Sequence, residues 1–222
     1  MSVILEVDLS RPEEADEAVR LAAATVAAGR LVIFPTETVY GLASRPDARD
    51  ATRRLFEAKR RPLGLSLPVL TGSVDQAFSL VEPAAGAAAL AASFWPGPLT
   101  LVLTRSTLSA PWYLGEREAS IGVRVPAGPI SLAILRLAGP LAATSANISG
   151  RPPLLDPAGI VEAFGDSVAV YLVLPAGAHP PEQAPSTVLD LTGPAPRIVR
   201  EGPIEAEAIR MALGGVQAES TG

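Results

Sequence analysis

The segment GRLVIFPTETVYGL, residues 29–42, joins an apolar run to a block of polar groups. Four consecutive apolar residues after a glycine, residues 31–34, predict a buried strand. Pro35 cannot donate to a sheet ladder and is expected to end that strand. Four polar side chains then precede Gly41: Thr36, Glu37, Thr38 and Tyr40. Because α/β proteins bind ligands beyond the carboxyl ends of their strands, we expect this block at a binding site.

Strand-like and helix-like patterns alternate along the chain, which defines the α/β class. Strands are expected at residues 3–9, 31–34, 67–70, 99–103, 121–125, 141–143, 168–174, 187–191 and 198–199. Helices are expected at residues 11–28, from 47 or 50 to 60, and at 84–94, 130–137 and 204–213, the first with Ser10 and Glu13 as a capping box. The unbroken series predicts one domain over residues 1–213, followed by a disordered tail at residues 214–222.

The composition predicts a globular protein without thiol chemistry. Of the 222 residues, 48% are hydrophobic and 18% are charged, enough for a sizeable core. There is no cysteine, which excludes disulfides, thiolate catalysis and zinc–thiolate sites. No apolar run approaches the roughly 20 residues that span a bilayer, and no basic leader is present, so we expect a cytoplasmic protein without a membrane anchor. The net charge of −5 disfavours extensive binding to nucleic acid.

The patterns typical of serine hydrolases and the usual glycine-rich phosphate loops do not occur in the sequence. The one histidine, His179, lies in a Pro-rich loop, and the nucleophile pattern G-x-S-x-G does not occur. Neither G-x-x-x-x-G-K-[ST] nor G-x-G-x-x-G after a strand is present. A nucleotide would therefore need another phosphate cradle.

Basic residues gather at the end of the second expected helix. Residues 53–61 contain five of the 18 Lys and Arg residues. Lys59 and Arg61 suit phosphate oxygens, the lysine as a point charge and the arginine through two parallel N–H groups. The alternative is a solvated helix end whose cations complement the helix dipole.

Arg124 is a second candidate, because it lies inside the apolar run at residues 121–125. A charge within such a strand is costly unless it is paired. Either Arg124 faces water on an edge strand, or it clamps a carboxylate.

Further polar groups stand beside other expected strands. Residues 144–150, TSANISG, follow one strand and form either a ligand loop or an ordinary capped turn. Ser186 and Arg200 add polar groups beside later strands. Because few acid–base residues occur among these blocks, the pattern favours a reaction run by positioning and charge neutralisation, such as phosphoryl or nucleotidyl transfer.

Seven segments, in order, resemble the YrdC-type threonylcarbamoyl-AMP synthases. They are FPTETVYGL (34–42), AKRRP (58–62), WPGPLTLVL (95–103), VRVP (123–126), TSANISG (144–150), PSTVLDL (185–191) and IVREGPI (198–204). The resemblance implies a YrdC-like twisted open mixed sheet with helices packed on it and a large concave cavity. It also implies the short, single-domain form of the family.

The resemblance implies a nucleotidyltransferase. L-threonine, bicarbonate or CO2, and ATP would give L-threonylcarbamoyl-AMP and pyrophosphate. The product would serve threonylcarbamoyladenosine formation next to the anticodon of tRNA, carried out by a separate transferase complex. Mg2+ would be held mainly by the phosphates, with no protein side chain assigned as a metal ligand.

The resemblance also assigns site residues. For ATP these are Lys59, Arg61, Ser145, Asn147 and Arg200, with Lys59 and Arg61 also as the catalytic pair. For L-threonine they are Thr36, Arg124, Thr144 and Ser186, with Arg124 as partner of the carboxylate. The role of Glu37 stays open between binding a substrate amine and capping a turn.

Three positions depart from the usual family pattern, and two other functions compete. Ser66 replaces a proline, Leu65 stands where a polar residue is common, and Pro153 replaces a hydroxyl residue. One alternative is a YrdC-like paralogue that binds double-stranded RNA, tRNA or a nucleotide without synthase activity, using Lys59, Arg60 and Arg61 as a basic patch. The other is a carbamoyl-handling domain like that of hydrogenase-maturation proteins, ranked last because those chains carry cysteines.

Overall fold

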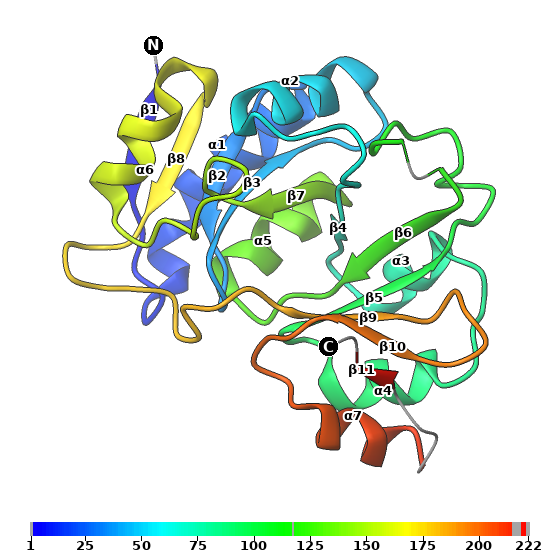
Figure 1. Cartoon of the computed structure of the whole chain (residues 1–222). Coiled ribbons are helices and arrows are strands. Elements are labelled where there is room, and N and C mark those ends of the chain that lie inside the picture. Colours follow the sequence, from blue (N-terminus) through cyan, green and yellow to red (C-terminus); the bar gives the residue numbers. More distant parts are fainter. Residues whose placement is uncertain (1, 117, 215–218, 221–222) are drawn as a thin grey trace.

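One mixed sheet of eleven strands runs through the part of the chain that the computed structural model describes, residues 2–116, 118–214 and 219–220 (Figure 1). The strands are β1 (Val3–Glu6), β2 (Val32–Pro35), β3 (Tyr40–Ser44), β4 (Val69–Leu70), β5 (Leu99–Thr104), β6 (Ser120–Arg124), β7 (Leu141–Ser145), β8 (Val170–Val173), β9 (Thr187–Asp190), β10 (Arg197–Arg200) and β11 (Glu219–Ser220). Their order in the sheet is β1-β8-β2-β3-β7-β4-β6-β5-β9-β10-β11. Parallel and antiparallel neighbours both occur, which confirms the predicted α/β class with a mixed sheet.

The helices pack on this sheet. They are α1 (Asp16–Ala27), α2 (Arg49–Lys59), α3 (Val74–Ser79), α4 (Ala87–Phe94), α5 (Pro129–Ala138), α6 (Pro157–Phe164) and α7 (Ala206–Ala212), with short 3-10 helices η1 (Pro12–Ala15) and η2 (Gly165–Ser167). Helices α1 and α5 pack on each other and on β2, while α4 packs on α7 near the other end of the sheet (Figure 1). No helix in the described residues is long and apolar enough to cross a membrane.

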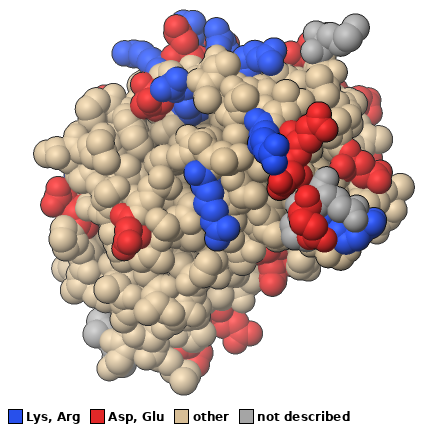
Figure 2. Space-filling model, turned by 180° about the vertical axis from the view of Figure 1, so that it is seen from behind, with Lys and Arg blue, Asp and Glu red and all other residues tan. Residues whose placement is uncertain are grey.

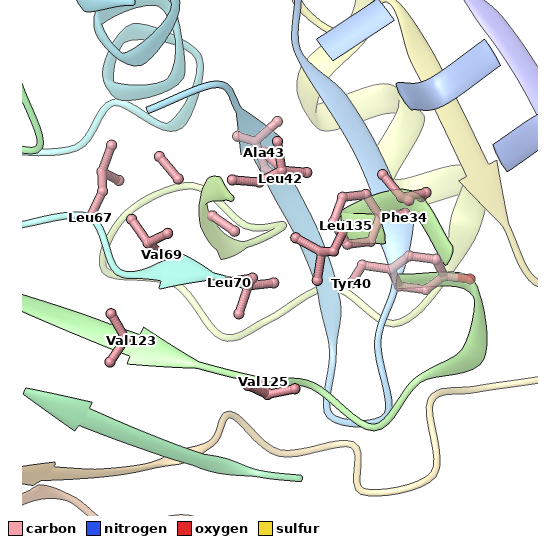
Figure 3. Packing of buried hydrophobic residues seen from close by; sticks show 14 of the residues in the cluster. Phe34, Tyr40, Leu42, Ala43, Leu67, Val69, Leu70, Val123, Val125 and Leu135 are labelled. Atoms are coloured by element: carbon pink, nitrogen blue, oxygen red, sulfur yellow. The ribbon is translucent and has the colours of Figure 1, made fainter. Parts of the chain in front are cut away.

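Strand β2 confirms the buried strand predicted from the opening segment. All four of its residues are buried between neighbours β8 and β3. Figure 3 shows Phe34 and Tyr40 of this region beside Leu135, and the same hydrophobic core continues through Leu42 and Leu70 to Val123. Tyr40 belongs to this core, because its ring is fully buried and its hydroxyl accepts a hydrogen bond from the Leu174 amide (2.8 Å).

One local prediction is wrong, and two short helices were missed. The capping box is wrong: Ser10 Oγ donates to Asp8 Oδ1 (2.7 Å), and η1 begins without a side-chain cap. Helices α3 and α6 were not predicted, although each begins with a side-chain cap, Ser73 Oγ accepting from the Gln76 amide and Asp156 accepting from the Gly159 amide. Both are short, at 6 and 8 residues, so few turns are available to display a helical period in the sequence.

The predicted tail, residues 214–222, lies mostly outside the described residues. Within it, the structure describes Gly214 and strand β11, which pairs parallel to β10.

Candidate functional site

A cavity of about 660 Å³, including its open mouth, lies where the β2–β3 turn meets the ends of β6, β7 and β10. Strands β2 and β7 run in one direction and β6 and β10 in the other, so the site is assembled across the twisted sheet rather than along one carboxyl edge. Seven of the nine predicted site residues line the cavity: Thr36, Arg61, Arg124, Thr144, Ser145, Ser186 and Arg200.

Lys59 lies behind this wall and holds one of the lining loops. Its Nζ donates to Ser145 O (2.6 Å), Asn147 Oδ1 (2.9 Å), Asn147 O (3.1 Å) and Ser145 Oγ (3.3 Å). The residue is 2% exposed, so the alternative of a solvated helix end is wrong for Lys59. Burial, with Arg61 and Arg200 nearby, lowers the pKa of Lys59 from 10.5 to about 7, while the four oxygens favour its charged form. Lys59 thus links the end of α2 to the loop after β7.

Arg61 and Arg200 are held by carbonyl oxygens and have no carboxylate partner among the described residues. Arg61 donates to Leu65 O (2.9 Å) and Ser66 O (2.8 Å). Arg200 donates to Ser186 O (2.9 and 2.7 Å) and Ser186 Oγ (3.0 Å). Burial, and then the charges of neighbouring arginines, lowers the pKa of Arg200 to about 10. We call Lys59, Arg61 and Arg200 the cationic end of the site.

Arg124 has a carboxylate partner. Its Nη2 donates to Glu37 Oε1 (2.6 Å) and Thr38 Oγ1 (3.0 Å), and its Nε donates to Gly97 O (3.0 Å). The Arg124 side chain is 7% exposed and that of Glu37 12% exposed. The alternative of a water-facing edge arginine is therefore wrong, since β6 lies between β4 and β5. We call Arg124, Glu37 and Thr38 the paired end of the site.

A chain of hydroxyls continues from the paired end into the β2–β3 turn. The Thr36 hydroxyl donates to Val39 O (2.6 Å), so Thr38 Oγ1 is the donor in its 2.9 Å contact with Thr36 Oγ1. The amides of Thr38 and Val39 also donate to Thr36 Oγ1 (3.2 Å each). The Thr36 hydroxyl is thus engaged in shaping the turn, although the residue lines the cavity.

A second cavity of about 780 Å³, which the sequence did not predict, adjoins the first. The two share Arg61, Pro68, Thr100 and Arg200 as lining residues, so the two arginines stand between them. Ser66 lines the second cavity, and its buried hydroxyl has no hydrogen-bond partner in the described structure.

The fold and this cationic cavity define a protein of the Sua5/YciO/YrdC family. A family model described as "Telomere recombination" matches residues 24–202. The chain therefore belongs to this family, as its motifs predicted.

Relatives that match nearly the whole chain are named for one activity. A Mycobacterium tuberculosis (strain H37Rv) protein named "Putative threonylcarbamoyl-AMP synthase" is 40% identical over 209 residues, 93% of this chain and 94% of the relative. The threonylcarbamoyl-AMP synthase of Pyrococcus abyssi is 36% identical over 219 residues, 98% of this chain. The solved structure of P. abyssi Sua5 complexed with L-threonine is similar with a TM-score of 0.84 and 33% identity over 99% of this chain. This chain spans 62% of the length of the P. abyssi protein.

Proposed function

We propose that this protein is an L-threonylcarbamoyladenylate synthase, which makes L-threonylcarbamoyl-AMP and pyrophosphate from L-threonine, bicarbonate or CO2, and ATP. The observation that carries the proposal is the cationic end, where the buried Lys59, the half-buried Arg61 and the exposed Arg200 have no carboxylate partner among the described residues. Positive charges gathered without a carboxylate repel one another and attract anions, so such a cluster is typical of a site that receives a polyanion. The names of the relatives, a threonylcarbamoyl-AMP synthase and a Sua5 complexed with L-threonine, support threonine as one ligand and are consistent with ATP as the other.

The reaction needs charge neutralisation more than an acid or base. The neutral threonine amine forms a bond to the carbon of CO2 and loses one proton to the solvent. An oxygen of the resulting carbamate then attacks the α-phosphorus of ATP. The bond from that phosphorus to the bridging oxygen breaks, and negative charge develops on the leaving pyrophosphate. Arg61 and Arg200 are placed to stabilise this charge. ATP would enter with Mg2+ bound mainly to its phosphates.

The ligand roles predicted for individual residues remain part of this proposal. ATP is assigned to the cationic end with the Ser145–Asn147 loop, and the second cavity beyond Arg61 and Arg200 has room for its nucleoside. Lys59 acts through the loop that it holds. Threonine is assigned to the paired end, with Thr144 and Ser186 nearby and the carboxylate on Arg124.

The biological setting follows from the product. Threonylcarbamoyl-AMP would pass to a transferase complex that modifies tRNA next to the anticodon. We place the activity in the cytoplasm, where ATP, threonine and tRNA are available together.

The test is pyrophosphate release by the purified protein with ATP, bicarbonate and L-threonine. We expect release only when threonine and bicarbonate are both present, and a product with the mass of threonylcarbamoyl-AMP. L-threonine with its amine acetylated is the matched control, because it keeps the carboxylate but cannot form a carbamate. Pyrophosphate release without threonine, or none with it, would contradict the proposal.

RNA binding is the competing function, and the patch predicted for it is wrong. Lys59 is buried, so Lys59, Arg60 and Arg61 do not form one exposed basic surface. On the face shown in Figure 2, basic side chains are interspersed with acidic ones rather than forming a continuous basic patch. Titration with tRNA at two salt concentrations decides the matter, since a steep salt dependence with micromolar or tighter affinity would favour RNA binding.

A further inference from the structure

Among the described residues, Glu37 is the one acidic residue that forms a salt bridge with an arginine lining the first cavity. Its side chain approaches Arg124 from the turn, and its Oε2 also accepts from the Gly128 amide (3.3 Å). Its backbone carbonyl accepts from the Glu182 amide (2.9 Å), which ties the loop before β9 to the same turn. Glu37 is therefore fixed through its backbone and through both oxygens of its carboxylate.

This arrangement leaves one nitrogen of Arg124 for a ligand. Gly97, Glu37 and Thr38 occupy Nε and Nη2, and Nη1 has no hydrogen-bond partner among the described residues. Arg124 lines the cavity, so Nη1 is the group available to a single carboxylate. Arginine usually binds phosphate through two parallel N–H groups, and in Arg124 the Nε and Nη2 groups are already engaged.

We propose that Glu37 is a specificity-determining positioning residue: it neutralises Arg124, so that the paired end accepts an amino acid carboxylate and excludes polyphosphate. The inference rests on the proposed function. A triphosphate carries several negative charges, so its binding free energy is most favourable at the cationic end, and the Glu37 carboxylate repels it from the paired end. A zwitterionic amino acid has no net charge, so the Glu37 carboxylate lowers its affinity for the paired end only slightly. One carboxylate thus separates two anionic substrates within one basic cavity.

The variant Glu37→Gln tests this, because it keeps an oxygen that can accept from Arg124 but removes the charge. In the unaltered protein we expect the KM for threonine to be nearly independent of ATP concentration. In Glu37→Gln, ATP and inorganic tripolyphosphate should compete with threonine, raising its KM roughly tenfold at saturating ATP. Glu182→Gln is the matched control: it removes an exposed carboxylate from the adjacent loop and should show no such competition.

An equal rise in the threonine KM at all ATP concentrations would overturn the proposal, because it would mean that Glu37 only supports the structure. A second measurement needs no variant. Calorimetric binding of threonine to the unaltered protein should be unaffected by a large excess of tripolyphosphate, and displacement of threonine would also overturn the proposal. This binding measurement does not depend on turnover. Failure of the proposed synthase activity would therefore be detected separately, as the absence of pyrophosphate release.

Discussion

Both ends of the cavity contain arginine, but its charge is compensated by a carboxylate at one end and not at the other. At the cationic end, Arg61 and Arg200 are held by backbone carbonyls, and no carboxylate in the described residues offsets their charge. At the paired end, Arg124 is offset by Glu37 at 2.6 Å. The difference teaches that partners, rather than the residue type, decide which anion an arginine can take. It also gives a set of substitutions whose effects should differ from one end to the other.

The largest effect is expected from breaking the paired end. Arg124→Ala leaves the Glu37 carboxylate buried without its cation, so the free energy of unfolding should fall by about 3–5 kcal/mol. Urea unfolding followed by circular dichroism measures this change. The double variant Arg124→Ala/Glu37→Gln should recover a good part of it, because no charge is then buried alone. Equal stability of the single and double variants would show that the pair is not coupled.

At the cationic end the main effect should be on binding. Arg61→Ala removes a charged donor, which should weaken ATP binding by about 1.5–3 kcal/mol, and Lys59→Ala should do the same by releasing the loop that it holds. Threonine affinity should change little in Arg61→Ala. Calorimetric titration of each ligand gives both values, with Arg60→Ala as the control at the exposed neighbouring position. If both variants retain normal ATP affinity, the phosphates bind elsewhere.

The sequence predicted the parts of this site better than their pairing. Apolar runs ending in polar blocks placed Thr36 and Ser145 correctly at strand ends, whereas Arg124, predicted inside a strand, is the last residue of β6. The Arg124–Glu37 pair could not be predicted, because 87 residues separate them and only the strand order brings them together. The buried charge in an apolar strand was nevertheless a signal that Arg124 needed a partner.

The burial of Lys59 could have been predicted from its spacing along the helix, but the sequence analysis did not use that spacing. Helix α2 buries Leu55 and Phe56, and Lys59 lies four and three residues after them, on the same face. Its position on the helix therefore predicted burial, whereas the basic run KRR suggested exposure. The second cavity had no comparable signal, since its walls include β6, β5 and β9, whose order in the sheet is not their order in the chain.

A smaller expected effect is proton uptake on ligand binding, which should also distinguish the two ends. In the folded protein the pKa of Lys59 is about 7, against 10.5 for an ordinary lysine. The unfolded chain therefore binds more protons between these values, so this group makes the free energy of unfolding rise with pH across that window. Bound ATP favours the ammonium form, so ATP binding should take up part of a proton near pH 8 and weaken as pH rises. Threonine binding should not show this uptake.

Titration calorimetry in two buffers of different ionisation enthalpy measures the uptake. Lys59→Met is the matched variant, because it keeps most of the side-chain volume and cannot titrate. Its remaining ATP binding should show no uptake near pH 8. Equal uptake in Lys59→Met and in the unaltered protein would assign the proton to another group.

The smallest expected effect is the salt dependence of the two affinities, and it needs no substitution. Attraction between the uncompensated cations and a triphosphate is screened by salt, so raising the ionic strength from about 0.05 M to 0.5 M should weaken ATP binding several-fold. Threonine is zwitterionic and meets an arginine that Glu37 already offsets, so its affinity should change by less than about twofold over the same range. Fluorescence or calorimetric titrations with a weakly binding salt measure both slopes. Parallel slopes would mean that the paired end carries net positive charge in solution and that Glu37 does not separate the two anions.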